Sequence, residues 1–122
     1  MRTATLALAA VAALAAAPAA RGATGEEVYR QVCSACHAEG KDKAPRLGDR
    51  KAWAPLLKEG QSKLTADGWI GVRAMPPQGG RADLPLEDFA RAVVYMSRAA
   101  GGSWKDPDPA MLANIQKRVK SR

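Results

Sequence analysis

Cys33-Ser34-Ala35-Cys36-His37 is the stretch that decides how this 122-residue chain is interpreted. Two thiols separated by two residues and followed at once by a histidine form the attachment signature of a c-type haem. On one helical turn both sulfurs reach the same edge of a flat macrocycle, form thioethers to its vinyl carbons, and leave the imidazole to bind the iron. The motif therefore predicts one covalently attached haem c, with His37 as its first axial ligand.

Two other interpretations of a Cys-x-x-Cys pair fit this chain poorly. A structural zinc site needs four ligands, whereas the whole chain holds two cysteines and one histidine, so carboxylates would have to complete it. A dithiol redox motif belongs in a βαβ context. The Ala-, Glu- and Lys-rich sequence around Cys33 and Cys36 does not offer the β-branched strands that this context needs.

The N-terminus has the three parts of a secretory signal peptide: the basic Arg2, an apolar run over residues 4–17, and a small-residue cleavage zone. Ala17-Pro18-Ala19 predicts cleavage before Ala20, which removes residues 1–19. A cut two or three residues later and a retained membrane anchor are the alternatives, although so short and alanine-rich a run is marginal for spanning a bilayer. Export to the periplasm agrees with the haem motif, because bacteria attach c-type haem outside the cytoplasm.

The chain is strongly basic, and this charge restricts the class of partner. Its formal charge is +7, and loss of Arg2 with the signal peptide leaves 18 basic against 12 acidic side chains, or +6. Excess positive charge on a small exported protein favours docking to an acidic surface of a redox partner, where it raises the association rate more than the affinity. Nucleic acid does not fit that compartment. We expect a monomer or a weak dimer.

Four helical segments without any alternating strand pattern predict an all-α domain. Thr24-Gly25-Glu26-Glu27 has the form of a capping box and starts a helix that runs into the haem motif. Asp49 can cap a second, short helix that ends near Gly60. The remaining segments are residues 62–71 and a longest helix that has Pro85 at its first position and ends near residue 100.

The stretch Arg73-Ala74-Met75-Pro76-Pro77-Gln78-Gly79-Gly80 is predicted to be a loop, neither helix nor strand. Its first proline drives Met75 into an extended conformation. Methionine is the next candidate for an axial ligand because the chain has no second histidine. Met96 falls on the apolar face of a predicted helix and Met111 lies in the tail. Met75 is therefore the predicted sixth ligand; a thioether that fills a gap in the core is the alternative.

Two more residues are candidates for contact with the haem. Arg46, in a basic loop over residues 40–49, can hold a haem propionate by a charge-assisted hydrogen bond. A solvated surface arginine is an equally good interpretation. Trp53 is predicted to form part of the haem wall, as a core tryptophan of so small a domain would.

A C-terminal extension, residues 105–122, follows the haem domain over residues 20–104. After the stiff break Asp106-Pro107-Asp108-Pro109, apolar residues share one face of a helical pattern and basic residues lie elsewhere on it. We expect this amphipathic, basic tail to fold back on its own domain. An anionic membrane surface and a redox partner are the alternative places for it.

With these residues in view, the chain resembles a class I cytochrome c and is similar to the short bacterial cytochrome c5 family. The resemblance runs from about Gly25 to Trp104. It rests on the haem motif, on Met75-Pro76-Pro77-Gln78-Gly79-Gly80, and on Gly25, Tyr29, Ala44-Pro45-Arg46-Leu47-Gly48-Asp49, Trp53 and Ala92-Val93-Val94-Tyr95-Met96. Members of that family often carry a second cysteine pair that forms a disulfide, which this chain lacks.

The resemblance implies the class I cytochrome c fold, in which short helices wrap around one haem. It implies His37 and Met75 as the two iron ligands, and it implies that the carbonyl of Pro45 accepts the Nδ1 proton of His37. It also implies that the first and last helices of the domain cross near Gly25, Tyr29 and Tyr95.

The residues and the family resemblance together predict that the protein transfers electrons and is not an enzyme. They favour a periplasmic one-electron carrier between partners of a respiratory chain. The partners in view are a membrane-bound respiratory complex and a reductase or terminal oxidase. One alternative is a haem-bearing subunit of a larger redox enzyme, docked through the basic tail. The other is a peroxidase or gas sensor with an open sixth site, for which no histidine remains as a distal acid or base.

Overall fold

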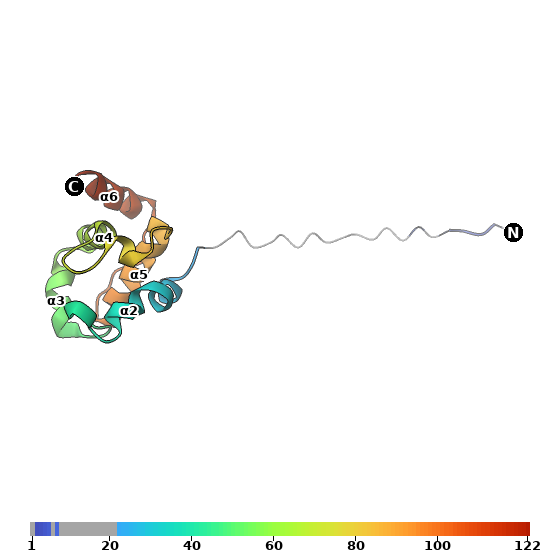
Figure 1. Cartoon of the computed structure of the whole chain (residues 1–122). Helices are drawn as coiled ribbons and strands as arrows, with labels where there is room; N and C mark the ends of the chain where they lie inside the picture. The colour runs from blue at the N-terminus through green and yellow to red at the C-terminus, as the bar shows by residue number, and fades with distance from the viewer. Residues whose placement is uncertain (1, 6, 8–21) are drawn as a thin grey trace.

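The structure is a computed structural model that describes residues 2–5, 7 and 22–122, and most of the predicted signal peptide over residues 1–19 lies outside these ranges (Figure 1). The described residues are helical or irregular apart from one isolated β-bridge, which confirms the all-α prediction. None of their helices combines the length and apolar character needed to cross a bilayer. In chain order the elements are α1 (Gly25–Val28), η1 (Tyr29–Cys33), α2 (Ser34–His37), η2 (Lys41–Lys43), α3 (Arg50–Lys58), α4 (Gln61–Ile70), η3 (Pro77–Gly80), α5 (Leu86–Ala99) and α6 (Pro109–Lys120).

The helix that carries the haem motif starts as predicted but is not α-helical throughout. The Thr24 hydroxyl accepts from the Glu27 amide and the Glu27 carboxylate accepts from the Thr24 amide, which completes the capping box. The next turn, η1, is π-helical: the amide of Ser34 donates to the carbonyl of Tyr29, five residues back. This wider turn changes the helical register immediately before the motif, a feature that apolar spacing in the sequence does not reveal.

α1 crosses α5 closely because Gly25 has no side chain. A Cβ at Gly25 would overlap the carbonyl oxygen of Arg91 on α5. Arg91 also donates from Nε to the Ala23 carbonyl oxygen at 2.9 Å, which ties the chain ahead of α1 to α5. At the same crossing the ring centroids of Tyr29 and Tyr95 are 5.3 Å apart. The helix crossing that the family resemblance implies is therefore present.

The two short middle helices begin and end close to the predicted positions. Asp49 caps α3, its Oδ1 accepting from the Ala52 amide at 3.1 Å. Gly60, at φ +94°, makes the turn between α3 and α4, a conformation that glycine adopts without steric cost. Gly71, at φ +98°, ends α4 in the same way. Together these turns bring α4 back toward the segment that contains Met75.

The segment from residue 73 to residue 85 departs from the prediction at two places. Residues 77–80 are not a plain loop, because they form the 3₁₀ turn η3, inside which Gln78 and Gly79 have positive φ. Pro85 is the N-cap of α5 and not its first helical residue, which is Leu86. Both differences are local, since η3 has the length of one turn and the α5 boundary shifts by one residue.

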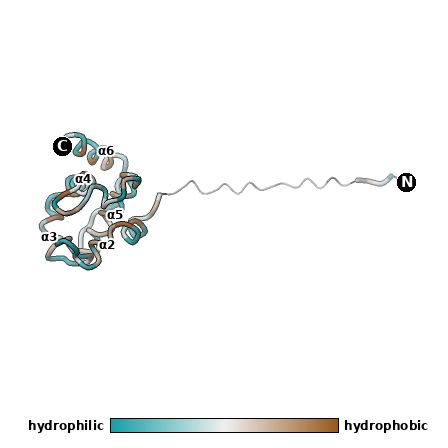
Figure 2. Tube along the Cα trace, in the orientation of Figure 1, coloured by the Kyte–Doolittle hydropathy of each residue, from teal (hydrophilic) through white to brown (hydrophobic). Residues whose placement is uncertain are grey.

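α6 folds back on the domain, as expected for the tail, and lies beside α4 (Figure 1). Asp108 caps it by accepting from the Met111 amide at 2.8 Å, and Pro109 occupies its first turn. Apolar and polar residues alternate along it (Figure 2). Its apolar side is buried, with Ile115 fully inaccessible in a cluster with Ala66 of α4 and Ala90 of α5. The apolar face of the tail is thus already covered by its own domain.

Candidate haem-binding site

A cavity of about 340 Å³ lies at the centre of the domain and collects side chains from almost every part of it. The haem motif contributes one wall and the segment around Met75 another. Apolar residues from α3, α4 and α5 supply most of the rest. The lining residues that bear on the chemistry are Cys33, Cys36, His37, Pro45, Trp53, Leu64, Gly68, Met75, Phe89, Val93 and Met96.

The two cysteines stand on consecutive helical turns at the cavity wall, and neither is in a disulfide. Cys33 is buried in the main core cluster and Cys36 is partly exposed. Burial raises the pKa of the Cys33 thiol to about 11, since the thiolate would lose its hydration there. Both sulfurs thus border one apolar space, and Cys33 is a neutral thiol when no thioether is present.

His37 is buried, and its Nδ1 lies 2.8 Å from the carbonyl oxygen of Pro45. Because a carbonyl can only accept, this bond requires the proton to be on Nδ1. The Nε2 atom then has a free lone pair, the state in which imidazole binds a metal. A second bond, from the Leu47 amide to the His37 carbonyl at 2.8 Å, fixes the backbone beside it. The hydrogen bond that the resemblance implies is present.

Trp53 forms part of the cavity wall beside His37. The residue is 3% exposed, and its ring centroid lies 6.1 Å from that of the His37 ring. The indole Nε1 donates to the carbonyl oxygen of Arg46 at 2.9 Å. Trp53 therefore supports the histidine side of the cavity in two ways, by contact with the imidazole and by fixing the loop after it.

Met75 lies at the wall that follows α4, on a segment with little freedom. Its amide donates to the Val72 carbonyl at 2.9 Å, and the Val72 amide donates to the Met75 carbonyl at 3.1 Å. Pro76 restricts the next step of the chain. On α4, Gly68 leaves the space that the methionine uses, since a Cβ at Gly68 would lie 3.5 Å from the Met75 Cε.

Met96 also lines the cavity, as expected for the apolar side of its helix, which the sequence predicts to face both the haem and the first helix. The residue is 3% exposed and belongs to the main core cluster, so the expectation that it lies on the apolar face of a helix is confirmed. That face, however, borders the same space as Met75. Met111 instead packs in the separate cluster under α6. Two thioethers thus border the cavity, one on a restrained loop and one on a helix in the core.

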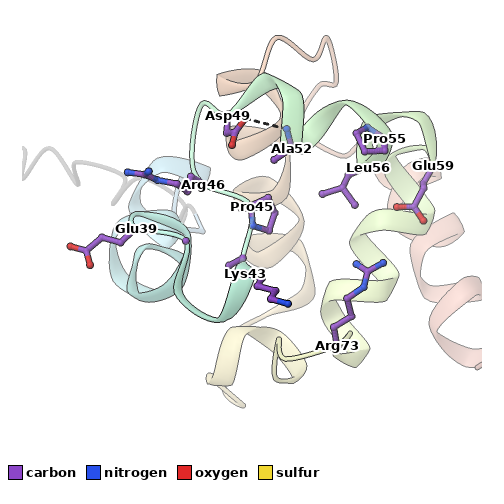
Figure 3. Close-up of a pocket in the computed structure, with 12 residues that line it drawn as sticks. Glu39, Lys43, Pro45, Arg46, Asp49, Ala52, Pro55, Leu56, Glu59 and Arg73 are labelled. Carbon is purple, nitrogen blue, oxygen red and sulfur yellow. Dashed lines mark hydrogen bonds between the residues drawn. The ribbon is translucent and has the colours of Figure 1, made fainter.

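The basic side chains that line the cavity do not include Arg46, the residue predicted from the sequence to hold a haem propionate. Arg46 is exposed, its side chain does not line the central cavity, and it lies against Gly40. Lys43 and Arg73 do line that cavity, and all three basic residues, Arg46 included, line an adjoining open hollow of about 630 Å³. Lys43 and Arg73 reach toward each other from different loops, whereas Arg46 points away (Figure 3). Its predicted contact with a propionate stays a prediction.

Sequence reasoning passed over Arg73, although a signal was present. It is a cation two residues before the candidate ligand Met75. Lys43 and Arg73 both have positive φ, 65° and 51°, which is uncommon for residues other than glycine and collects at functional sites. The mouth of the cavity therefore carries two cations on strained backbone, one from each side.

These residues fit a haem c. Two thiols on neighbouring helical turns, an imidazole with its Nε2 free, a thioether, and an apolar cavity with cations at its mouth match the group's vinyl carbons, iron, macrocycle and carboxylates.

Comparison with known proteins gives the same assignment. Residues 20–96, more than half of the chain, match the family model described as cytochrome c oxidase, cbb3-type, subunit III. Cytochrome c-555 of Chlorobaculum tepidum is 37% identical over 78 residues, which cover 61% of this chain and 72% of that protein. Cytochrome c5 of Azotobacter vinelandii is 37% identical over 76 residues, which cover 61% of this chain and 92% of that one. The chain belongs to the cytochrome c family.

Solved structures agree on the class I monohaem fold. A cytochrome c in an electron transfer complex with nitrite reductase is 47% identical, with a TM-score of 0.60, over 62% of this chain and 93% of that one. A mono-haem ferrocytochrome c from Shewanella putrefaciens is 33% identical, with a TM-score of 0.56, over 64% and 96%. This cytochrome therefore carries one covalently bound haem c and is an electron carrier, not an enzyme.

Proposed function

We propose that this cytochrome c is a periplasmic one-electron carrier whose iron is held between Nε2 of His37 and Sδ of Met75. The bond between His37 Nδ1 and the Pro45 carbonyl carries the proposal, because it leaves Nε2 free to bind a metal. The second position rests on Met75, which borders the same cavity on a segment restrained by Val72 and Pro76.

The protein's part in electron transfer is to keep both ligands in place while the charge changes. Haem, when bound, supplies an iron that takes up and gives back one electron. Pro45 holds the imidazole in one orientation, and the paired hydrogen bonds of Val72 and Met75 restrain the thioether. Phe89 and Val93 keep the cavity apolar, which disfavours the more highly charged oxidised centre. These features support a carrier with a high potential and little reorganisation.

We assign the haem carboxylates to the mouth formed by Lys43 and Arg73. Both side chains border the cavity, and charge-assisted hydrogen bonds to carboxylates are among the stronger polar contacts in proteins. Arg46 remains the competing assignment from the sequence. The same cations would attract an acidic partner surface, since they lie at the opening of the cavity.

A redox enzyme in the same compartment is the partner that the comparisons favour. One similar structure is described as a cytochrome c in a complex with nitrite reductase. We infer a reductase or a membrane-bound respiratory complex as the acceptor of this chain's electrons. Residues 1–19 would direct export to the periplasm and then be cleaved off, and the N-terminal sequence of the mature protein tests this directly.

The matched family model gives weight to one alternative, a haem-bearing subunit of a larger complex, because its description names an oxidase subunit. α6 could not dock through its apolar face, which packs on α4 and α5. Docking would have to use the exposed basic residues Lys117, Arg118 and Lys120. Co-purification with a complex that survives high salt would favour this alternative over a mobile carrier.

A redox titration combined with carbon monoxide binding tests the carrier. The proposal predicts a reversible one-electron transition and ferrous protein that binds carbon monoxide slowly or not at all, because both axial positions are taken. Rapid binding of carbon monoxide would show an open or labile sixth position. That result would contradict the proposed ligation by Met75. It would favour the alternative of a peroxidase or gas sensor with an open sixth position.

A further inference from the structure

α6 lies beyond residues 20–96 and closes a second hydrophobic cluster on the outside of α4. Ile115 and Ala66 are each 0% exposed, and Ala90 is 1% exposed. Leu86, Met111, Leu112 and Val119 are partly buried around them. Ala66 on α4 and Ala90 on α5 have small side chains, and Ile115 packs against both of them. α6 is therefore packed into the fold and not loosely attached.

The opposite side of α4 faces the haem cavity. Leu64 and Gly68 line that cavity, one helical turn apart. Gly68 is tightly enclosed, since a Cβ at that position would lie 3.0 Å from Phe89 Cζ and 3.5 Å from Met75 Cε. α4 is therefore a single layer between α6 and the side chain of Met75.

α4 connects to Met75 by a short and restrained path. The Gly71 amide donates to the Asp67 carbonyl at 2.9 Å and ends the helix. Val72 follows at once and exchanges two hydrogen bonds with Met75. A shift of α4 away from the cavity would carry Val72, and so the methionine, with it.

The chain end adds a polar contact on the same side. Arg122 Nη2 lies 2.5 Å from Asp67 Oδ1, an ion pair without the alignment of a hydrogen bond. The Asp67 side chain is 12% exposed and the Arg122 side chain 41%, so water screens this pair from the Arg122 side only. Lys63 reaches the other oxygen of Asp67 at 2.9 Å. α6 and the C-terminus thus hold α4 at both Ala66 and Asp67.

We propose that α6 is a brace that positions Met75 by pressing α4 against the haem cavity, with Ile115 as its principal positioning residue. The proposal rests on the proposed ligation of iron by Met75. The braced unit comprises α4, Val72 and Met75. Removing the Ile115 side chain lets α4, Val72 and Met75 move before the rest of the domain does. Met75 then leaves the ferric iron at a higher rate.

The test uses the full-length ferric holoprotein with imidazole as an external ligand. Loss of the weak red absorption band of methionine-to-iron ligation gives the rate of Met75 displacement. We expect Ile115→Ala to raise this rate tenfold or more, and Arg122→Gln to raise it by a smaller factor. Gln116→Ala, on the exposed side of α6, should leave it unchanged.

Val28→Ala is the matched control, because Val28 is 1% exposed and belongs to the main core cluster with residues of α1 and α5. It should lower the denaturation midpoint about as much as Ile115→Ala but leave the displacement rate within twofold of wild type. Equal acceleration by both variants would overturn the brace, since α6 would then contribute only general stability. Should Ile115→Ala not fold, Ile115→Val replaces it, with a smaller acceleration expected.

The two proposals fail in different ways. Wild-type protein without the red band overturns Met75 as ligand and the brace with it. Wild-type protein that shows the band, together with an unchanged displacement rate in Ile115→Ala, overturns the brace alone.

Discussion

The Nδ1 of His37 and the carbonyl oxygen of Pro45 lie 2.8 Å apart, eight residues from each other in the chain. This one bond joins the haem motif to the loop after it, selects the tautomer of the imidazole, and fixes the plane of the ring. Pro45 suits the position because its ring restricts φ, so the carbonyl keeps its direction.

Pro45→Gly tests that role. Glycine keeps the carbonyl but frees the backbone, so we expect a loss of about 1 kcal/mol in the free energy of unfolding and faster solvent exchange of the His37 Nδ1 proton. Chemical denaturation and proton NMR of the ferrous protein measure the two effects. Pro107→Gly, in the segment before α6, serves as the control for proline loss alone. An exchange rate equal to that of wild type would contradict the orienting role.

Trp53 allows packing and hydrogen bonding to be separated. Trp53→Phe keeps most of the ring but removes the Nε1 donor to Arg46, which we expect to cost about 1 kcal/mol. Trp53→Ala also removes the buried ring, at a cost of about 3–5 kcal/mol. Denaturant unfolding of the holoproteins gives both values. If Trp53→Phe is as stable as wild type, the bond to Arg46 contributes nothing to the fold.

Gly25 tests the crossing of α1 and α5. Alanine there would place its Cβ against the Arg91 carbonyl, and the helices would have to separate. We expect a loss of about 1–3 kcal/mol, typical of overpacking. Gly48→Asn is the control, because Gly48 has φ +80° with open space around it and asparagine tolerates that conformation. Its cost should come from backbone strain alone, at about 1 kcal/mol or less. A stable Gly25→Ala variant would mean that the crossing is looser than the structure indicates.

Arg73 and Lys43 should tune the reduction potential. A cation near the iron disfavours the more positive ferric state, so Arg73→Gln and Lys43→Gln should each lower the potential. The expected effect is on the order of 0.5–1 kcal/mol, or about 20–40 mV for one electron. Arg46→Gln is the matched comparison, because Arg46 lines the adjoining hollow but not the central cavity, and its side chain points away from Lys43 and Arg73 (Figure 3). A larger shift for Arg46→Gln than for Arg73→Gln would reverse the assignment of the carboxylates.

Much of the site could be predicted because its chemistry depends on residue type and local spacing. The haem motif, the cap at Asp49 and the restrained position of Met75 are visible in short stretches of sequence. The packing of the tail was also predictable, since its apolar face needs a partner.

The rest depends on tertiary geometry. The π turn before the motif leaves no mark in apolar periodicity, because it shifts the register by a single residue within a helix that is helical on either side. Arg73 and Lys43 come from different loops, and only the fold brings them to one opening. Met96 lies on a helix side that the sequence predicts to face the haem, but only the fold shows that its thioether borders the same cavity as that of Met75.

Ligation of the iron by His37 and Met75 is tested by the ferric absorption spectra of the mature protein and of two variants, Met75→Ala and Met96→Leu. We predict that the weak red band of methionine ligation is present in wild type, absent in Met75→Ala and retained in Met96→Leu. Both methionines border the cavity, so each variant controls for the other. A band that survives Met75→Ala, or that disappears in Met96→Leu alone, would contradict ligation by His37 and Met75.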